Sequence, residues 1–363
     1  MSVVGVRRPM RVRRLLGTAV LVCTSAVLLT GIFTAGDSDA LGWDFRVAYL
    51  PAAESVLEGR SPYPDPHDPT LEVGRAYAYP PPFAFALVPF VALPEDVAAF
   101  LAVAACLAAL WGALYLVGVR DVRCFAVVPI WAAGWNTLEM ANASAVVALL
   151  IAVCWRFRAT VWRLGIALAG ALSLKLFVWP TLIWLLATRR FRAAGVTVAF
   201  AFALTLTAWA ALGFSGLSDY LDLLSRIAAQ DSYSLEDIFL ELGLGSMSGR
   251  LVAALAGSAL LVICLSLVRR GDERGAFVAA VGAAFVLSPI VWIHYLVILV
   301  VPLGLVRRRF SALWLTPIVL WVSPRIDNGT ALQSIVPMLV IAVVCYAALR
   351  RPVTSSVSVQ GAA

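Results

Sequence analysis

The chain has 363 residues, of which 62% are hydrophobic and only 13% are charged, and its mean hydropathy is +0.91. A water-soluble domain carries about one-quarter charged residues, so this composition excludes an ordinary soluble protein and predicts a polytopic helical membrane protein. The net charge of +7 comes with arginines grouped at the ends of apolar runs. That grouping is typical of cytoplasmic loops rather than of a nucleic-acid surface.

The fold class predicted from these runs is all-α. Backbone groups that face lipid must be satisfied within their own segment, and the Ala, Leu and Val blocks do not alternate as the strands of a barrel do. The first run, residues 15–35, follows five arginines and is too long for the apolar region of a signal peptide. We therefore expect an uncleaved first helix with its N-terminus inside, followed by an acidic first external loop at residues 36–82.

The later apolar runs predict short or broken helices. They cover residues 83–118, 124–135, 141–155, 164–187, 194–214, 251–268, 276–306, 311–322 and 331–349. If every basic cluster is cytoplasmic, the stretches 124–155, 164–187 and 276–306 must each leave and return, yet each is too short for two spans of about twenty residues. Broken helices of this kind line cavities or are buried in protein.

These segments predict one transmembrane domain, residues 1–350, with about 10–12 transmembrane or broken helices. A second external loop is expected at residues 215–250, and a disordered cytoplasmic tail at residues 351–363. The chain has no nucleotide-binding or zinc-protease motif, and its six cysteines are widely spaced without a nearby histidine. We expect no cofactor and no metal site.

Asp44 is the first candidate for chemistry, in "GWDFRVAY" a few residues after the first helix. As a structural residue it would cap the amphipathic helix expected at residues 45–58. As a functional residue it would act as a general base, because partial desolvation near the membrane interface raises the basicity of a carboxylate. The sequence leaves both interpretations open.

Three predicted hairpin tips point to the same side as Asp44, and they hold Asn136 and Asn142, Lys175, and the segment from Trp292 to His294. Lys175 lies in an otherwise uncharged run, where a charge is by default a functional candidate. Its ammonium suits a phosphate, and a lysine snorkelling to the interface is the alternative. His294 either donates to a phosphate oxygen or bonds a backbone carbonyl. The two asparagines are either ligands or ordinary polar tips.

Aromatic residues add further substrate-binding candidates. Tyr79 belongs to the proline- and tyrosine-rich stretch "YAYPPPF". Such rings anchor a chain at the membrane interface, and their flat faces also stack on sugar rings. Tyr63 and Trp292 are candidates of the same kind.

Four stretches follow one another along the chain and together indicate a family: "WDFRVAYLPAAESVLEGRSPY", "YAYPPPFAFALVPFVALP", "LSLKLFVWPTLIWLLATRRFRAA" and "LSPIVWIHYLVILVVPLGL". Over about residues 40–310 the chain resembles glycosyltransferase family 87, an actinobacterial GT-C-type family of polyprenyl-phosphate-dependent mannosyltransferases. The resemblance implies a plasma-membrane enzyme with its active site on the extracytoplasmic face.

The resemblance also implies a reaction, the transfer of a sugar, expected to be mannose, from a polyprenyl-phosphate donor to an envelope glycolipid or polysaccharide acceptor. Asp44 would be the catalytic base of an inverting displacement, and Lys175 and His294 would hold the phosphate. Transfer of arabinofuranose from polyprenyl-phosphate arabinose is an alternative. A transporter or flippase of lipid-linked intermediates is an alternative of another class, because broken helices around a cavity would serve transport too.

Overall fold

The computed structural model describes residues 9–34, 41–68, 71, 73–228, 232–323 and 330–350. Within these ranges the chain is helical and contains no strand, which confirms the all-α prediction. The tail expected to be disordered, residues 351–363, lies outside the described residues.

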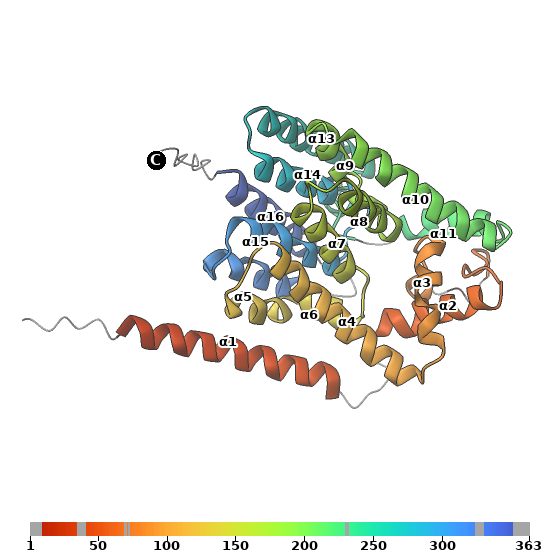
Figure 1. Cartoon of the computed structure of the whole chain (residues 1–363), viewed down its shortest axis with the longest axis horizontal. Coiled ribbons are helices and arrows are strands. Elements are labelled where there is room, and N and C mark those ends of the chain that lie inside the picture. Colours follow the sequence, from red (N-terminus) through yellow and green to blue (C-terminus); the bar gives the residue numbers. More distant parts are fainter. Residues whose placement is uncertain are drawn as a thin grey trace, which may run out of the picture.

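The helices follow one another with short connections (Figure 1). Elements labelled η are 3₁₀-helices, except η1, which is a π-helix. Their bounds are α1 (Pro9–Thr34), η1 (Phe45–Tyr49), α2 (Leu50–Leu57), η2 (Val73–Arg75), α3 (Pro81–Val91), α4 (Glu95–Leu116), α5 (Val122–Val127), η3 (Val128–Ile130), α6 (Ala132–Glu139), α7 (Ser144–Arg156), α8 (Val161–Leu174), η4 (Leu176–Val178), α9 (Pro180–Ala187), α10 (Phe191–Ala211), α11 (Leu217–Ala228), α12 (Leu235–Glu241), α13 (Ser246–Arg269), α14 (Glu273–Leu287), η5 (Ile293–Leu299), α15 (Val300–Val306), η6 (Ala312–Val322) and α16 (Ala331–Leu349).

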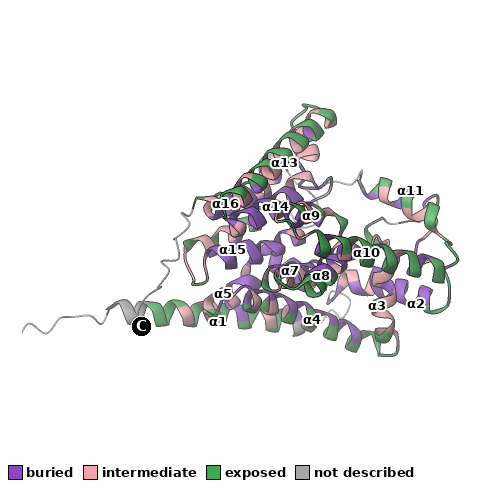
Figure 2. Cartoon of the chain, turned by 45° about the horizontal axis from the view of Figure 1, so that its top comes forward, coloured by how far each residue is buried: buried purple, intermediate pink, exposed green. Residues whose placement is uncertain are grey.

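Four helices in the described part of the chain are long and apolar enough to cross a membrane, at Arg14–Ile32, Glu95–Leu116, Phe191–Ala211 and Ser246–Arg269. In three of them, α1, α10 and α13, less than a third of the apolar stretch is buried, and Figure 2 shows these helices mainly in green and pink. Exposed apolar faces of this size suit a bilayer. The protein is therefore a polytopic membrane protein.

The centre of the bundle is α14, whose residues from Gly275 to Phe285 are all buried. Its contact with α13 is close, because a Cβ atom at Gly257 would lie 2.3 Å from the Leu287 side chain. On the other side, Phe277 packs edge-on against Trp184 with ring centres 4.7 Å apart. Small residues let helices approach without water between them, which is how membrane bundles are packed.

The predicted breaks are present. The run 164–187 divides at Lys175 into α8, η4 and α9, and the run 276–306 divides between Leu287 and Ile293. Within 124–155, α6 and α7 meet at 115°.

Other expectations need correction. The run 83–118 is not one segment, because residues 92–94 separate α3 from α4. Pro94 precedes α4 with extended backbone, which a helix interior cannot accommodate. Residues 45–58 are helical, but they begin as a π-helix rather than as an α-helix. The apolar run expected at residues 311–322 is helical as well, and residues 312–322 form a 3₁₀-helix.

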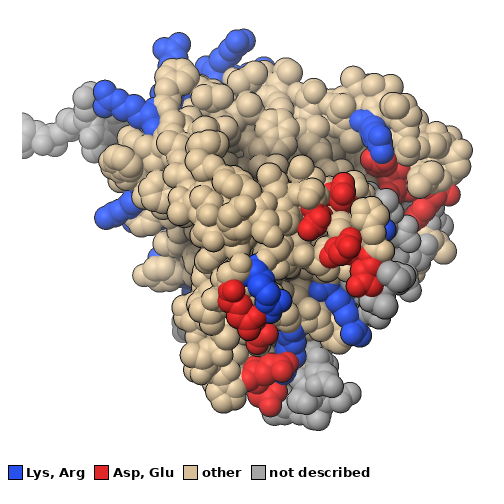
Figure 3. Space-filling view, turned by 90° about the vertical axis from the view of Figure 1, so that its right-hand side faces the viewer, with Lys and Arg blue, Asp and Glu red and all other residues tan. Residues whose placement is uncertain are grey.

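Charge separates the two ends of the molecule. The described start of α1 and the end of α16 lie at the left of Figure 1, while α2, α3 and α11 lie at the right. Figure 3 looks onto this right-hand end, where acidic side chains gather and few basic ones accompany them. Arginines from three loops, Arg120, Arg158 and Arg308 among them, line clefts away from that end.

Candidate active site

The segment that carries Asp44 is fastened to α4 and α6. The Arg46 guanidinium donates to Glu95 at 2.8 Å and to Asp96 at 2.7 Å, in the first turn of α4. The Gly42 amide donates to the Glu139 carbonyl oxygen at 2.8 Å, at the end of α6. Both contacts hold the backbone on either side of Asp44.

The Asp44 carboxylate does not cap the helix that follows it, because it accepts no hydrogen bond from a backbone amide of η1. Its Oδ2 atom instead accepts a bond of 2.5 Å from the Asn142 amide nitrogen, on a segment 98 residues away. The structure therefore contradicts the capping interpretation. Oδ1 has no hydrogen-bond partner in the described part of the chain, so it is available to a bound hydroxyl.

The loop between α6 and α7 sets the direction of the Asn142 amide. Asn142 Oδ1 accepts bonds from the Ser144 amide at 2.9 Å and the Ser144 hydroxyl at 2.8 Å, which leaves Nδ2 to point at Asp44. The residue before it, Ala141, has a φ of 50°. A left-handed conformation at alanine costs about 1–2 kcal/mol and is retained where the surrounding structure requires it. Here it turns Asn142 toward Asp44.

Two tyrosines extend this network. The Tyr49 hydroxyl lies 3.4 Å from Asp44 Oδ2 and 2.8 Å from the Tyr79 hydroxyl. The Asn142 amide nitrogen also lies 3.1 Å from the Tyr49 hydroxyl. Asp44 therefore has two hydrogen-bond partners, Asn142 and Tyr49, and Tyr79 in turn contacts both of them.

Lys175 lies at the break after α8, and its side chain is buried. Its Nζ atom is 3.6 Å from the centre of the Tyr295 ring and 5.4 Å from that of Tyr79. Nζ has no hydrogen-bond partner among the residues that the structure describes. A snorkelling lysine would place its ammonium in water, so the structure contradicts that alternative. A buried ammonium with three unused donors is a site prepared for an anion.

His294 lies in the first turn of η5 with its ring buried. Its Nδ1 is 3.3 Å from Asn136 Oδ1, and its Nε2 has no partner among the described residues. Because Asn136 Oδ1 can only accept, Nδ1 carries the proton and Nε2 is free to take one. Trp292 packs beside the ring, with centres 5.8 Å apart.

The model of the family described as Glycosyltransferase family 87 matches residues 77–291, more than half of the chain. The protein belongs to glycosyltransferase family 87. No curated protein matches it, and no solved structure does. The matched range contains Tyr79, Asn136, Asn142 and Lys175, while Asp44 and His294 lie outside it.

The electrostatics of this candidate site favour a basic carboxylate. Burial raises the pKa of Asp44, which lies outside the candidate spanning helices, and the bonds from Asn142 and Tyr49 and the charge of Lys175 oppose the rise. A raised pKa makes a carboxylate a stronger base. No group of three or more potential metal ligands occurs among the described residues.

Tyr63 and Trp292 are the two remaining residues that the sequence predicted to bind substrate. Tyr63 lies in an aromatic cluster behind Tyr79, where its ring centre is 5.5 Å from that of Trp209 and 4.7 Å from that of Tyr220. Its hydroxyl donates to the Tyr79 carbonyl oxygen at 2.9 Å, so it supports Tyr79 from behind. Trp292 contacts the ring of His294 and lies at the edge of the site.

Sequence reasoning missed two tyrosines of the site. Tyr49 comes five residues after Asp44, a spacing that faces the same way in a π-helix but not in an α-helix. Tyr295 covers the Lys175 ammonium and directly follows His294. Its position in the segment "WIHY" was the available signal.

Proposed function

We propose that this family 87 glycosyltransferase moves mannose from a polyprenyl-phosphate donor to an envelope glycolipid or polysaccharide acceptor, by an inverting single displacement. The observation that carries the proposal is the buried, unbonded Lys175 ammonium in one site with a carboxylate that has an unused oxygen. A sugar phosphate between the two would meet a cation at the leaving group and a base at the acceptor.

Asp44 acts on the acceptor in this mechanism. Its Oδ1 accepts a hydrogen bond from the acceptor hydroxyl and takes the proton while the hydroxyl oxygen bonds to the anomeric carbon. The bond from that carbon to the phosphate oxygen breaks at the same time, and its electron pair leaves with the phosphate. One attack from the side opposite the phosphate inverts the anomeric centre, so one carboxylate is enough.

Lys175 and His294 act on the leaving group. The donor is a phosphodiester with one negative charge, and the departing polyprenyl phosphate gains a second. A cation already in place stabilises this developing charge without reorganising. The second charge also favours a proton on His294 Nε2, which then donates to a phosphate oxygen. Asn136 fixes the ring by its contact with Nδ1.

Membrane topology supports an extracytoplasmic site. Arginine clusters mark the cytoplasmic ends of membrane segments. The Asp44 segment contacts the first turn of α4, whereas Arg120 follows the last turn of the same helix. A polyprenyl donor keeps its chain in the bilayer, so its phosphate lies at the interface, where an extracytoplasmic Asp44 site would meet it.

The test is Asp44→Asn, assayed in purified protein with labelled polyprenyl-phosphate mannose. Loss of a general base lowers the rate by about 10²–10⁴-fold, and we expect donor binding to remain. Glu54→Gln is the matched control, because Glu54 is an exposed acid on α2 of the same loop. Unchanged transfer by Asp44→Asn would remove Asp44 from the base role. Product formation from polyprenyl-phosphate arabinose alone would refute mannose as the donor sugar.

A further inference from the structure

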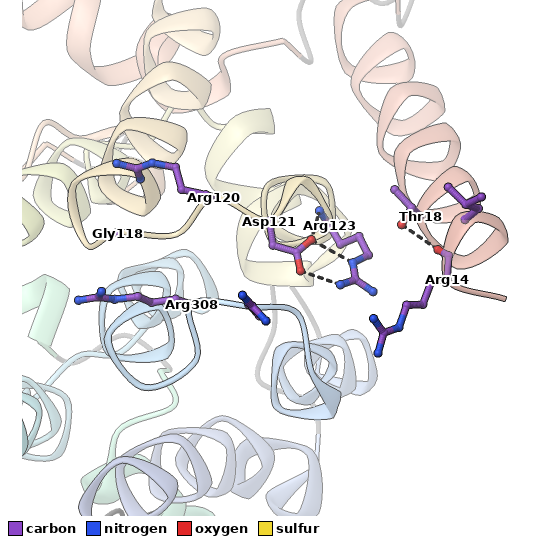
Figure 4. A pocket seen from close by; sticks show the side chains of 9 residues that line it. Arg14, Thr18, Gly118, Arg120, Asp121, Arg123 and Arg308 are labelled. Atoms are coloured by element: carbon purple, nitrogen blue, oxygen red, sulfur yellow. Dashed lines mark hydrogen bonds and ion pairs between the residues drawn. The ribbon is translucent and has the colours of Figure 1, made fainter. Parts of the chain in front are cut away.

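A polar cavity lies far from Asp44, at the other end of α4. It has a volume of about 570 Å³ and is lined by Arg14, Leu15, Thr18, Gly118, Arg120, Asp121, Arg123, Arg308 and Arg309. Figure 4 shows Arg14 on α1 at one side of the Asp121–Arg123 pair, with Arg120 from the loop after α4 and Arg308 from the loop after α15 on the other side. Because α4 has 22 residues and rises 1.5 Å per residue, about 33 Å separates this cleft from the Asp44 segment.

The cleft holds one carboxylate against five arginines, and that carboxylate is already neutralised. Asp121 accepts bonds of 2.9 Å and 2.7 Å from the Arg123 guanidinium and one of 3.0 Å from the Phe310 amide. These bonds lower the pKa of Asp121 to about 2, so the pair stays ionised at neutral pH. Arg120 is also satisfied, because its guanidinium donates to the Tyr115 carbonyl oxygen at 2.7 Å.

Three arginines remain without an acidic partner in the described ranges, Arg14, Arg308 and Arg309. Arg308 packs against the turn after α4, since a Cβ atom on Gly118 would lie 3.1 Å from its Nε. Gly118 has a φ of +91°, which glycine adopts without strain. The Arg308 side chain is therefore placed before any ligand arrives.

One wall of the cleft is apolar and exposed. Leu15 on α1 is 70% exposed and lines the cleft directly beside Arg14. Only 11% of the apolar part of α1 is buried, and Figure 1 shows α1 running along the bundle apart from its centre. An acyl chain can lie along this face while its headgroup enters the cleft.

We propose that this cleft binds the phosphate headgroup of an anionic phospholipid, with Arg14, Arg308 and Arg309 as its ligands. Guanidinium groups bind phosphate oxygens in pairs and are favoured for phosphate recognition. A free phosphate ion would use the same arginines but would gain nothing from Leu15. Basic pockets between helices on the cytoplasmic side suit acidic headgroups. The lipid would join α1 to the loops after α4 and α15.

The experiment measures thermal unfolding of the full chain in neutral detergent, with phosphatidylglycerol, phosphatidylcholine or inorganic phosphate added. We compare Arg14→Gln/Arg308→Gln with Arg269→Gln/Arg270→Gln, a control that removes two exposed arginines at the end of α13, outside the cleft. Arg309→Gln serves as a milder second variant if the double variant does not fold. A basic residue at an anionic surface contributes a factor of about five in affinity. The cleft double variant should therefore bind phosphatidylglycerol on the order of 20-fold more weakly.

The expected result is a rise in unfolding temperature with phosphatidylglycerol that persists in the Arg269/Arg270 control and falls by more than half in the cleft variant. Equal losses in both double variants would overturn the proposal, because the effect would then be diffuse surface charge. An equal rise with inorganic phosphate or with phosphatidylcholine would overturn it as well.

Discussion

Replacing Lys175 by methionine separates function from stability in this protein. Methionine keeps the unbranched length of the side chain and removes its charge. The ammonium is buried, has no hydrogen-bond partner among the described residues and touches the Tyr295 ring at 3.6 Å. A charge at about 4 Å from a phosphate contributes about 4 kcal/mol at an effective dielectric constant of 20. Removing one preorganised donor from such a site lowers kcat about 10²–10³-fold, and we expect that loss here.

The free energy of unfolding should not fall with kcat in this variant. Burial of an ion costs several kcal/mol, and the contact with Tyr295 offsets about 2 kcal/mol of that. Lys175→Met should therefore leave the free energy of unfolding unchanged or raise it by about 1–2 kcal/mol. Transfer assays and thermal unfolding of the same preparation give both quantities, with Lys175→Arg as a variant that keeps the charge.

Chemical labelling gives an independent check, because Lys175 is the single lysine of the chain. An amine reagent that enters the site should modify Lys175, and the donor should protect it. A Lys175→Met protein that transfers sugar at the wild-type rate would refute the reasoning. So would a variant that loses several kcal/mol of stability, since the ammonium would then be a structural element.

Three further outcomes follow from the geometry. Burial raises the pKa of Asp44, and a base works only when it is deprotonated, so the transfer rate should rise with pH, with an apparent pKa above about 4. A transfer rate that does not change with pH while the protein stays folded would contradict this. Gly42→Ala should reduce both stability and transfer, because Gly42 has a φ of +72° and its Cβ would lie 3.3 Å from Ala99 Cβ. The control Gly59→Ala, with a φ of +71° and open space around the position, should lower the free energy of unfolding by only about 1 kcal/mol and leave transfer intact. Equal effects of the two variants would show that the contact with Ala99 is irrelevant. Asp121→Asn should lower the free energy of unfolding by about 1–2 kcal/mol at neutral pH. Because bonding to Arg123 lowers the pKa of Asp121 to about 2, this contribution is complete above about pH 4 and is lost as the pH falls toward 2. A difference in stability between the two proteins that does not depend on pH would exclude the ion pair.

Much of the site was visible in the sequence because its charged and polar residues interrupt apolar runs. Lys175 and His294 stand out for this reason, and both lie at breaks between helices as predicted. Asp44 was ambiguous, since a carboxylate before a helix suits a cap as well as a base. Its bond to Asn142 decided against the cap.

The sequence by itself determined the helical membrane class, the breaks within residues 124–155, 164–187 and 276–306, and the family, because hydropathy, charge placement and order of motifs are properties of the chain read locally. Only the tertiary structure decided which residues share a site. The Asn142 amide reaches Asp44 because α6 and α7 meet at 115° and Ala141 adopts a left-handed turn. Tyr49 faces the same carboxylate because η1 is a π-helix. Such contacts depend on angles between packed helices, and no local pattern of residues specifies those angles.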